Sequence, residues 1–364
     1  MKEFNTEGTC IPEMHYMVDT SSKIEHITQL IDKGKYFTIN RSRQYGKTTT
    51  ISQLKRTLKS RMQVISISFE GIGEEPFGTN AAFVRTFIEL CSDYFRFTKI
   101  EKADADKWND ISDFNEEKPF KYLSGKITEL CEKYEIVLMI DEMDKCSANQ
   151  VFLNFLGMLR DKYLSRNEGE DYTFKSVILA GVYDVKNLKL KLRPDEERKY
   201  NSPWNIAVDF TVDMSFHPEE IATMLTDYEN DVHTGMDIKA ISEELYHYTS
   251  GYPYLVSWLC KWIEEQGNRE WNSQCIQRAI KHYYCADSTL KDDLIKNYEN
   301  NPVLREMIDS MIISGREYSF VSTDEAVNLG LTFGIFKSSE NSDVKLEISN
   351  IIFANILNIQ SVTH

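Results

Sequence analysis

The sequence lacks the features that mark membrane and secreted proteins. No run of apolar residues approaches the roughly 18 that a membrane-spanning helix needs, and the first residues (MKEFNT) lack the apolar core of a signal peptide. The seven cysteines are an odd number, are scattered, and include no Cys-x-x-Cys pair or zinc-ligand spacing. We therefore expect a cytoplasmic protein without a disulfide framework, a structural zinc site or a membrane partner.

Positive charge is also scarce. Lys and Arg total 42 against 57 Asp and Glu, which gives a net charge of −15. This surplus of negative charge argues against a general affinity for nucleic acid, although a local basic patch can override it. With 27% charged and 41% apolar residues among 364, the composition is that of a globular protein of two or three domains.

Residues 41–48 (RSRQYGKT) have the pattern of a phosphate-binding loop of the Walker A kind. They follow an apolar, strand-like stretch at residues 36–39 and precede apolar positions at helical spacing, Ile51, Leu54 and Leu58. In such a loop, backbone N–H groups at a helix N-terminus surround the phosphates of ATP. The residues expected to bind the nucleotide are Arg43, Gln44, Tyr45, Gly46, Lys47, Thr48 and Thr49.

Two side chains of this loop have expected chemical roles. Lys47 would reach the β- and γ-phosphates, and the Thr48 hydroxyl would ligate Mg²⁺. The alternative is a surface turn that contains a lysine, because the usual pattern has glycine five residues before Gly46 and this chain has Arg41. The helical spacing that follows favours the phosphate-binding interpretation.

A second motif, of the Walker B kind, begins with five apolar residues at 136–140 and continues with Asp141 and Glu142. Such a run is typical of a central parallel strand that is buried on both faces. Asp141 would ligate Mg²⁺ together with Thr48, and Glu142 would activate the attacking water, so Lys47 and Glu142 are the candidate catalytic residues. The alternative is that Asp141 or Asp144 caps the N-terminus of a following helix.

Segments 39–50, 140–144 and 177–184 together resemble the predicted AAA-ATPase-like proteins of bacteria. In that family the loop typically begins Arg-Pro-Arg, so Arg41 matches the family whereas Ser42, in place of proline, departs from it. The resemblance extends from about Cys10 to the C-terminus. It implies an ATPase whose layout is similar to that of archaeal-type and STAND ATPases.

The resemblance also implies residues that sense the γ-phosphate. In these ATPases a strand next to the Asp-Glu strand ends in a polar sensor, and Asp184 is the preferred candidate here. Arg193 or Arg198, in the basic stretch that follows, would act as an arginine finger in its own subunit or in a neighbour's, which would require a homo-oligomer. A capping aspartate and a solvated loop are the alternatives.

The N-terminal segment precedes the first expected helix, and in similar ATPases such a segment borders the adenine. His15 and Tyr16 are therefore candidates for stacking on the base, although packing as a structural aromatic is the favoured interpretation. Residues 101–118 are rich in charges and turn formers and predict an exposed loop.

From residue 213 on, helical spacing dominates, and the Gly-Tyr-Pro turn at 251–253 resembles the lid-domain turn of archaeal-type ATPases. Residues 301–364 show the order of a winged helix-turn-helix, with a strand expected at residues 317–321. This segment has four Lys and Arg against eight Asp and Glu, a net charge of −4, so phosphate contacts are not expected from it. We expect it to be a packing or partner-binding module.

The predicted fold is an α/β P-loop NTPase with an ASCE-type parallel sheet flanked by helices, followed by an α-helical lid and a small winged-helix-like C-terminal domain. The expected boundaries are 1–212 for the ATPase core, 213–295 for the lid and 296–364 for the C-terminal domain. The leading functional hypothesis is an ATP-hydrolysing switch that signals to an unknown protein client. The alternatives are a P-loop phosphotransferase, which Glu142 argues against, and a nucleic-acid-associated ATPase that uses its tail as a reader.

Overall fold

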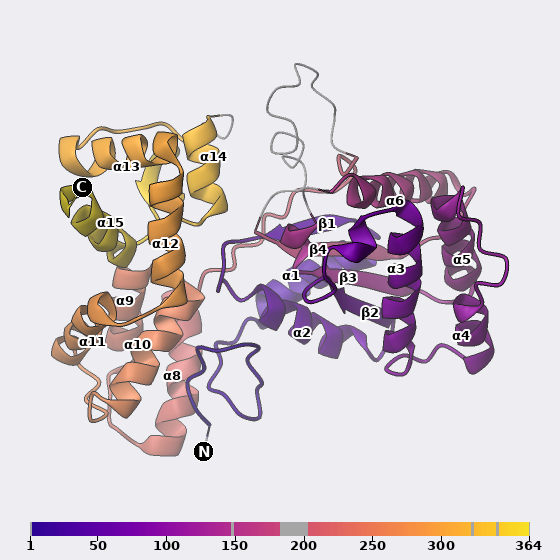
Figure 1. Cartoon of the computed structure of the whole chain (residues 1–364). Coiled ribbons are helices and arrows are strands. Elements are labelled where there is room, and N and C mark those ends of the chain that lie inside the picture. The colour runs from indigo at the N-terminus through magenta and orange to yellow at the C-terminus, as the bar shows by residue number, and fades with distance from the viewer. Residues whose placement is uncertain (1, 147–148, 183–202, 322–323, 340–341, 364) are drawn as a thin grey trace. The chain divides into compact units, whose positions relative to one another are not determined.

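The computed structural model describes residues 2–146, 149–182, 203–321, 324–339 and 342–363 (Figure 1). Contacts divide the chain into two compact units. The helical unit comprises Met1–Ser21, Arg41–Thr49 and Asp213–His364. The sheet unit comprises Ser22–Asn40 and Thr50–Val212. Each unit has a hydrophobic core of its own.

The sheet unit is built on a four-stranded parallel sheet with the strand order β1-β4-β3-β2. The strands are β1 (Phe37–Asn40), β2 (Gln63–Ser68), β3 (Ile136–Asp141) and β4 (Ser176–Gly181). Every residue of β3 and β4 is buried, which confirms the prediction that apolar runs form central strands. An isolated parallel bridge between Phe37 and Val208 adds a fifth segment beside β1.

Helices cover both faces of this sheet (Figure 1). Alternate residues of β3, Ile136, Leu138 and Ile140, share one core with apolar side chains of α3, α5 and α6. The helices are α1 (Ser21–Asp32), α2 (Lys47–Leu58), α3 (Asn80–Phe95), α4 (Lys102–Asn109), α5 (Pro119–Lys133) and α6 (Gln150–Glu168), with short 3₁₀ turns η1 (Glu75–Phe77) and η2 (Met143–Lys145). The apolar positions predicted to lie on one face of α2 are confirmed, since Ile51, Leu54 and Leu58 are buried.

The predicted loop at residues 101–118 is wrong in its first half. Helix α4 forms there, and the Trp108 side chain is only 2% exposed, with its Nε1 donating a hydrogen bond to the Ile88 carbonyl at 2.9 Å. Asp104 is also buried and pairs with Lys133. The other charged residues of α4 are exposed, and Trp108 is its one fully buried apolar side chain, so the charge density hid the helical pattern.

The helical unit contains eight described helices and one antiparallel strand pair in its C-terminal part (Figure 1). The elements are α8 (Pro218–Val232), α9 (Ile238–Thr249), α10 (Pro253–Glu265), α11 (Ser273–Cys285), α12 (Thr289–Asn300), α13 (Pro302–Ser314), α14 (Glu325–Thr332), β5 (Phe336–Ser339), β6 (Ser342–Ile348) and α15 (Ile351–Thr363). The expected caps are present: Pro218 opens α8, and Asp237 accepts the Ala240 N–H at 3.1 Å to cap α9.

The C-terminal segment, residues 301–364, differs from the expected order of helices and strands at one element. The strand expected at residues 317–321 is reduced to an isolated bridge between Ser319 and Lys345. The identification of the tail as a winged helix, and of α8–α11 as a lid, stays a prediction. Among the described residues, no helix combines the length and apolar character that crossing a bilayer requires.

A buried ion pair fixes α6 against α5 in the sheet unit. The Lys162 ammonium is 2% exposed and donates to Asp171 at 2.6 Å, to the Thr128 hydroxyl at 2.7 Å and to the Ser124 carbonyl at 3.1 Å. Burial raises the pKa of Asp171, but the hydrogen bonds from Lys162 and Thr128 outweigh it and hold that pKa below its usual range.

We expect Lys162→Met to lower the free energy of unfolding by about 2–3 kcal/mol at neutral pH, because it leaves the Asp171 carboxylate without its cation. The depressed pKa of Asp171 contributes stability above its unfolded value of about 4, and that contribution is lost as the pH falls below it. Denaturant unfolding at several pH values should therefore show that the difference in unfolding free energy between the wild type and Lys162→Met becomes smaller at acidic pH. Lys121→Met, at an exposed position of α5, is the control, and an equal deficit in both variants would contradict the assignment.

Candidate functional site

The loop between β1 and α2 has the backbone of a phosphate-binding loop. Gln44 (φ 56°) and Gly46 (φ 79°) are both in the left-handed region, and α2 begins at Lys47. A helix N-terminus presents backbone N–H donors and a partial positive charge, which together favour an anion. The position of Gly46 agrees with its residue type, because glycine adopts positive φ without steric cost.

The Lys47 ammonium is held by its own loop. It donates hydrogen bonds to the Arg41 carbonyl at 2.8 Å and to the Ser42 carbonyl at 2.9 Å, and the residue is only 8% exposed. The side chain therefore folds back over the loop and places its charge there. This placement is the one expected for a lysine that neutralises phosphate oxygens.

Within the helical unit, Tyr252 contacts this loop. The Tyr252 hydroxyl donates to the Arg43 carbonyl at 2.6 Å and lies 3.0 Å from the Ser42 hydroxyl, which must then be the donor to Tyr252. The ring of Tyr45 packs edge-on against the Tyr252 ring at 4.7 Å. Ser42 thus uses a hydroxyl that the proline typical of the resembling family could not supply.

The position of Tyr252 depends on Gly251. This residue has φ +69°, and a Cβ there would lie 2.1 Å from the Phe216 carbonyl oxygen, so no other residue fits without moving the backbone. The Gly-Tyr-Pro turn predicted between two helices is confirmed, with α9 ending before it and α10 beginning at Pro253. Its contact with the loop was not predicted.

Two further parts of the helical unit contact the loop. At the start of α12, Asp293 pairs with Arg43 at 3.3 Å, and the Thr289 hydroxyl accepts from Gln44 Nε2 at 3.0 Å. Between α14 and β5, a Cβ on Gly334 would lie 2.4 Å from the Ser42 hydroxyl. The loop is thus embedded among side chains that no local pattern connects to it.

Burial changes the titration of two loop residues. It lowers the pKa of Arg41, which Tyr45 and Asp213 partly offset. It raises the pKa of Tyr45 to about 12, with Asp213 adding to the rise and Arg41 opposing it. Tyr45 is therefore neutral at physiological pH, and Arg41 occupies the usual glycine position as a partly buried cation.

The acidic motif lies at the end of β3 in the sheet unit. Asp141 is the last residue of that strand, and its carboxylate accepts the Glu142 N–H at 2.9 Å. Glu142 has φ 55°, a left-handed conformation that a non-glycine residue seldom adopts. Such strain clusters at functional sites because the surrounding structure has to enforce it.

Asp144 ties this turn to the next strand. Both of its carboxylate oxygens lie 2.8 Å from the Val182 N–H, just after β4, and a Cβ on Gly181 would approach the same carboxylate to 2.9 Å. The N-cap of α6 is Asn149, which accepts the Val151 N–H at 2.7 Å. The alternative in which Asp141 or Asp144 caps the following helix is therefore wrong.

The sheet register relates the acids to the start of the loop. Strand β4 pairs with both β1 and β3, with Asn40 opposite Gly181 and Ile140 opposite Leu179. The carboxyl ends of β1 and β3 thus lie at one edge of the sheet, two strand spacings or roughly 10 Å apart. The chain leaves Asn40 for the phosphate-binding loop at the same edge at which Asp141 and Glu142 are placed.

The remaining predicted residues have mixed outcomes. Asp184, Arg193 and Arg198 lie outside the described residues, although the pairing of β4 with β3 confirms that the expected sensor strand adjoins the Asp-Glu strand. Tyr16 is a structural aromatic, as favoured: it is 4% exposed and packs against Phe4 at 5.1 Å and Tyr228 at 5.3 Å. The buried His15 accepts the Ile11 N–H at 2.8 Å.

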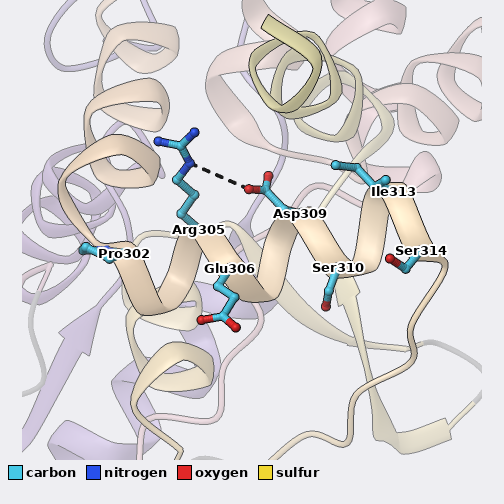
Figure 2. Close-up of a pocket in the computed structure, with 7 residues that line it drawn as sticks. All are labelled: Pro302, Arg305, Glu306, Asp309, Ser310, Ile313 and Ser314. Atoms are coloured by element: carbon cyan, nitrogen blue, oxygen red, sulfur yellow. Dashed lines mark ion pairs between the residues drawn. The ribbon is translucent and has the colours of Figure 1, made fainter. Parts of the chain in front are cut away.

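A depression on α13 does not resemble a catalytic site. It has a volume of about 410 Å³, and Figure 2 shows that its lining side chains all come from one helix. Arg305 pairs with Asp309 at 3.7 Å, and Asp309 also accepts from Tyr298 at 2.6 Å. Arg305 and Asp309 thus neutralise each other. In the part of the chain that the structure describes, no group of three metal-ligating side chains is present.

We expect Tyr252→Phe to accelerate amide hydrogen exchange in residues 41–46 and to lower the free energy of unfolding by about 1–2 kcal/mol, because the loop loses its hydroxyl partner. Tyr254→Phe is the matched control, since that hydroxyl lies 3.3 Å from Ser288 rather than on the loop. Mass spectrometry of exchanged peptides measures the local effect. Unchanged protection of the loop in Tyr252→Phe would show that the hydroxyl does not hold it.

Comparison with known proteins supports the fold and the family. The Walker-type ATPase paby2304 of Pyrococcus abyssi superposes with a TM-score of 0.64 at 13% identity, covering 97% of this chain and 99% of that chain. The Aeropyrum pernix ORC2 protein in its ADPNP-ADP complexes covers 98% of each chain at 11% identity, but its TM-score of 0.45 is too low to support an argument. No curated protein matches the sequence.

The likeness to paby2304 shows the fold, a parallel α/β sheet of the P-loop ATPase kind with many helices. The family resemblance carried by the loop and the acidic strand is confirmed over most of the chain, because residues 8–345 match the family described as AAA-like domain. The protein therefore belongs to the AAA-like domain family.

Proposed function

We propose that the protein is a Mg²⁺-dependent ATPase that works as a molecular switch. The observation that carries this proposal is the strand order of the sheet unit. With β4 between β1 and β3, the entry to the phosphate-binding loop and the Asp141–Glu142 pair share one edge of the sheet. Lys47 and the acids would then act on the same triphosphate.

The residues of the proposed site fit ATP and Mg²⁺ by their chemistry. A threonine hydroxyl and a carboxylate are the hard oxygen ligands that Mg²⁺ prefers, and Thr48 and Asp141 supply them. The loop supplies N–H donors from Arg43 to Thr49, with Lys47 as the cation. When bound, Mg²⁺ would neutralise charge on the phosphate oxygens.

Each catalytic residue has a separate task. Glu142 accepts a proton from the attacking water, and the left-handed backbone at this position sets the direction of its carboxylate relative to Asp141. Lys47 stabilises the negative charge that builds on the phosphates. Asp144 acts as a positioning residue, because its carboxylate fixes the turn that carries Glu142 to the end of β4.

A switch requires that the nucleotide state alter contacts elsewhere. Phosphate oxygens would compete with the Arg41 and Ser42 carbonyls for the Lys47 ammonium, because charge-assisted hydrogen bonds are stronger than bonds to neutral acceptors. The adjoining Arg43 carbonyl is the acceptor for Tyr252. We infer that this short path passes the nucleotide state from the loop to the predicted lid at 213–295 and the winged-helix-like module at 296–364.

The site favours hydrolysis over transfer to another acceptor. A phosphotransferase usually does without an acid directly after the strand aspartate, whereas Glu142 occupies that position with a strained backbone. Asp184 as the sensor and Arg193 or Arg198 as an arginine finger complete the proposal. The client would be a protein, because the tail with its net charge of −4 lacks the cations for phosphate contacts.

We expect Lys47→Ala to abolish measurable ATP binding, because the loop loses its cation. Glu142→Gln should bind ATP normally yet reduce turnover about 10²–10⁴-fold, since it removes only the general base. Calorimetric titration and phosphate release measure the two effects, and Lys121→Ala controls for the loss of one surface charge. Turnover that survives both substitutions would refute the proposal.

We expect ATP to drive assembly of the Glu142→Gln protein if a neighbour supplies the arginine finger. Light scattering after size exclusion should show at least a doubled mass with ATP and Mg²⁺, and the single-chain mass with ADP. Arg193→Ala or Arg198→Ala would then reduce turnover in the wild-type background. A single-chain mass in both nucleotide states would assign the finger to the same subunit.

A further inference from the structure

The sheet unit has a basic groove at the amino-terminal end of β2, the end of the sheet away from Asp141. It has a volume of about 570 Å³ and lies among the C-terminal half of α2, the start of β2 and the segment that follows α3. None of its lining residues is acidic. Five are cations: Lys55, Arg56, Lys59, Arg96 and Lys99.

This concentration of positive charge contrasts with the rest of the chain, whose net charge is −15. Other cations of the sheet unit lie beside an acid, as Arg61 does beside Asp32 and Lys133 beside Asp104. Among the described residues, Lys55, Lys59, Arg96 and Lys99 have no ion-pair partner. Like charges held together repel, so a groove of this kind favours an anionic ligand.

Aromatic side chains are interleaved with these cations. The Phe97 side chain is 56% exposed, and the Arg96 guanidinium lies 4.9 Å from its ring centroid. Tyr94 also lines the groove, with the Lys55 ammonium 5.9 Å from its ring. Cations that follow a groove beside an accessible ring are the arrangement that binds single strands, since phosphates meet the cations and bases stack on the ring.

We propose that this groove binds single-stranded nucleic acid. The cations contact successive phosphates, and Phe97 stacks on an unpaired base. The groove is separate from the proposed nucleotide site, because Lys47 begins α2 whereas Lys55 and Arg56 lie in its last turn. It is also separate from the acidic tail. A concave lining with one exposed ring suits a strand better than the flat surface of a membrane.

The proposal is tested with the full chain and a fluorescent oligothymidylate of about 12 nucleotides, within the range of site sizes for such grooves. The groove variant is Lys59→Gln, Arg96→Gln and Lys99→Gln. The control variant is Lys102→Gln, Lys118→Gln and Lys121→Gln, which removes the same charge at exposed positions of the same unit. Thermal unfolding checks that both variants fold.

We expect the wild type to bind with an affinity that falls steeply with salt. The groove variant should bind at least about tenfold more weakly at low salt, and the slope of log affinity against log salt should fall in magnitude by about two, from three lost phosphate contacts. The control should keep the wild-type slope. Phe97→Ala should weaken binding about tenfold with the slope unchanged, because stacking does not depend on counterions.

Four results would overturn the proposal. The first is the absence of binding by the wild type at low salt, and the second is an equal loss in the groove and control variants. The third is full affinity in Phe97→Ala. The fourth is equal affinity for duplex DNA, which would show that the groove recognises polyanions by charge alone. None of these outcomes depends on ATP turnover, so they are independent of the proposed ATPase activity.

Discussion

The pairing of β4 with both β1 and β3 is the constraint on which the candidate site depends. In a parallel sheet all carboxyl ends share one edge, and the register of β4 brings the end of β1 level with the end of β3 to within about one residue. Because every residue of β3 and β4 is buried, a shift in this register would expose apolar residues or bury polar ones. The hydrophobic core therefore determines where Asp141 and the first residue of the loop are placed.

The loop itself is held by groups other than those that would bind phosphate. The contacts of Tyr252 engage a carbonyl and a hydroxyl, whereas phosphate recognition uses backbone N–H donors. Lys47 serves both purposes. Its ammonium donates to two loop carbonyls in this structure, and in the proposed site it would bind phosphate. Tyr252 can thus support the loop without occupying its N–H donors, and Lys47 is the residue that serves both roles.

Local patterns in the sequence predicted much of this structure. Strand, loop and helix around Lys47 follow from hydrophobic spacing, and the acids after β3 follow from an apolar run that ends in Asp141. The hydrogen bond between Tyr252 and Arg43 joins residues 209 positions apart, so no local pattern could reveal it. The role of Asp144 was missed for a similar reason, because its partner, Val182, belongs to a different strand connection.

Surface features were harder to predict than the core. Helix α4 was missed because one buried tryptophan anchors a segment that is otherwise charged. The cations of the basic groove are spread over residues 55–99 and come together only when α2, β2 and the end of α3 are packed. Net charge, which is a sum over the whole chain, gives no information on such a cluster.

The backbone at Glu142 has a consequence for the evolution of this protein. A left-handed conformation costs a side-chain-bearing residue about 1 kcal/mol more than glycine, so glycine would be the more stable choice at this position. A search for thermostable variants would accordingly tend to replace the carboxylate. This sequence has a glutamate there, so the preference of the backbone and the proposed chemistry act in opposite directions on the residue at position 142.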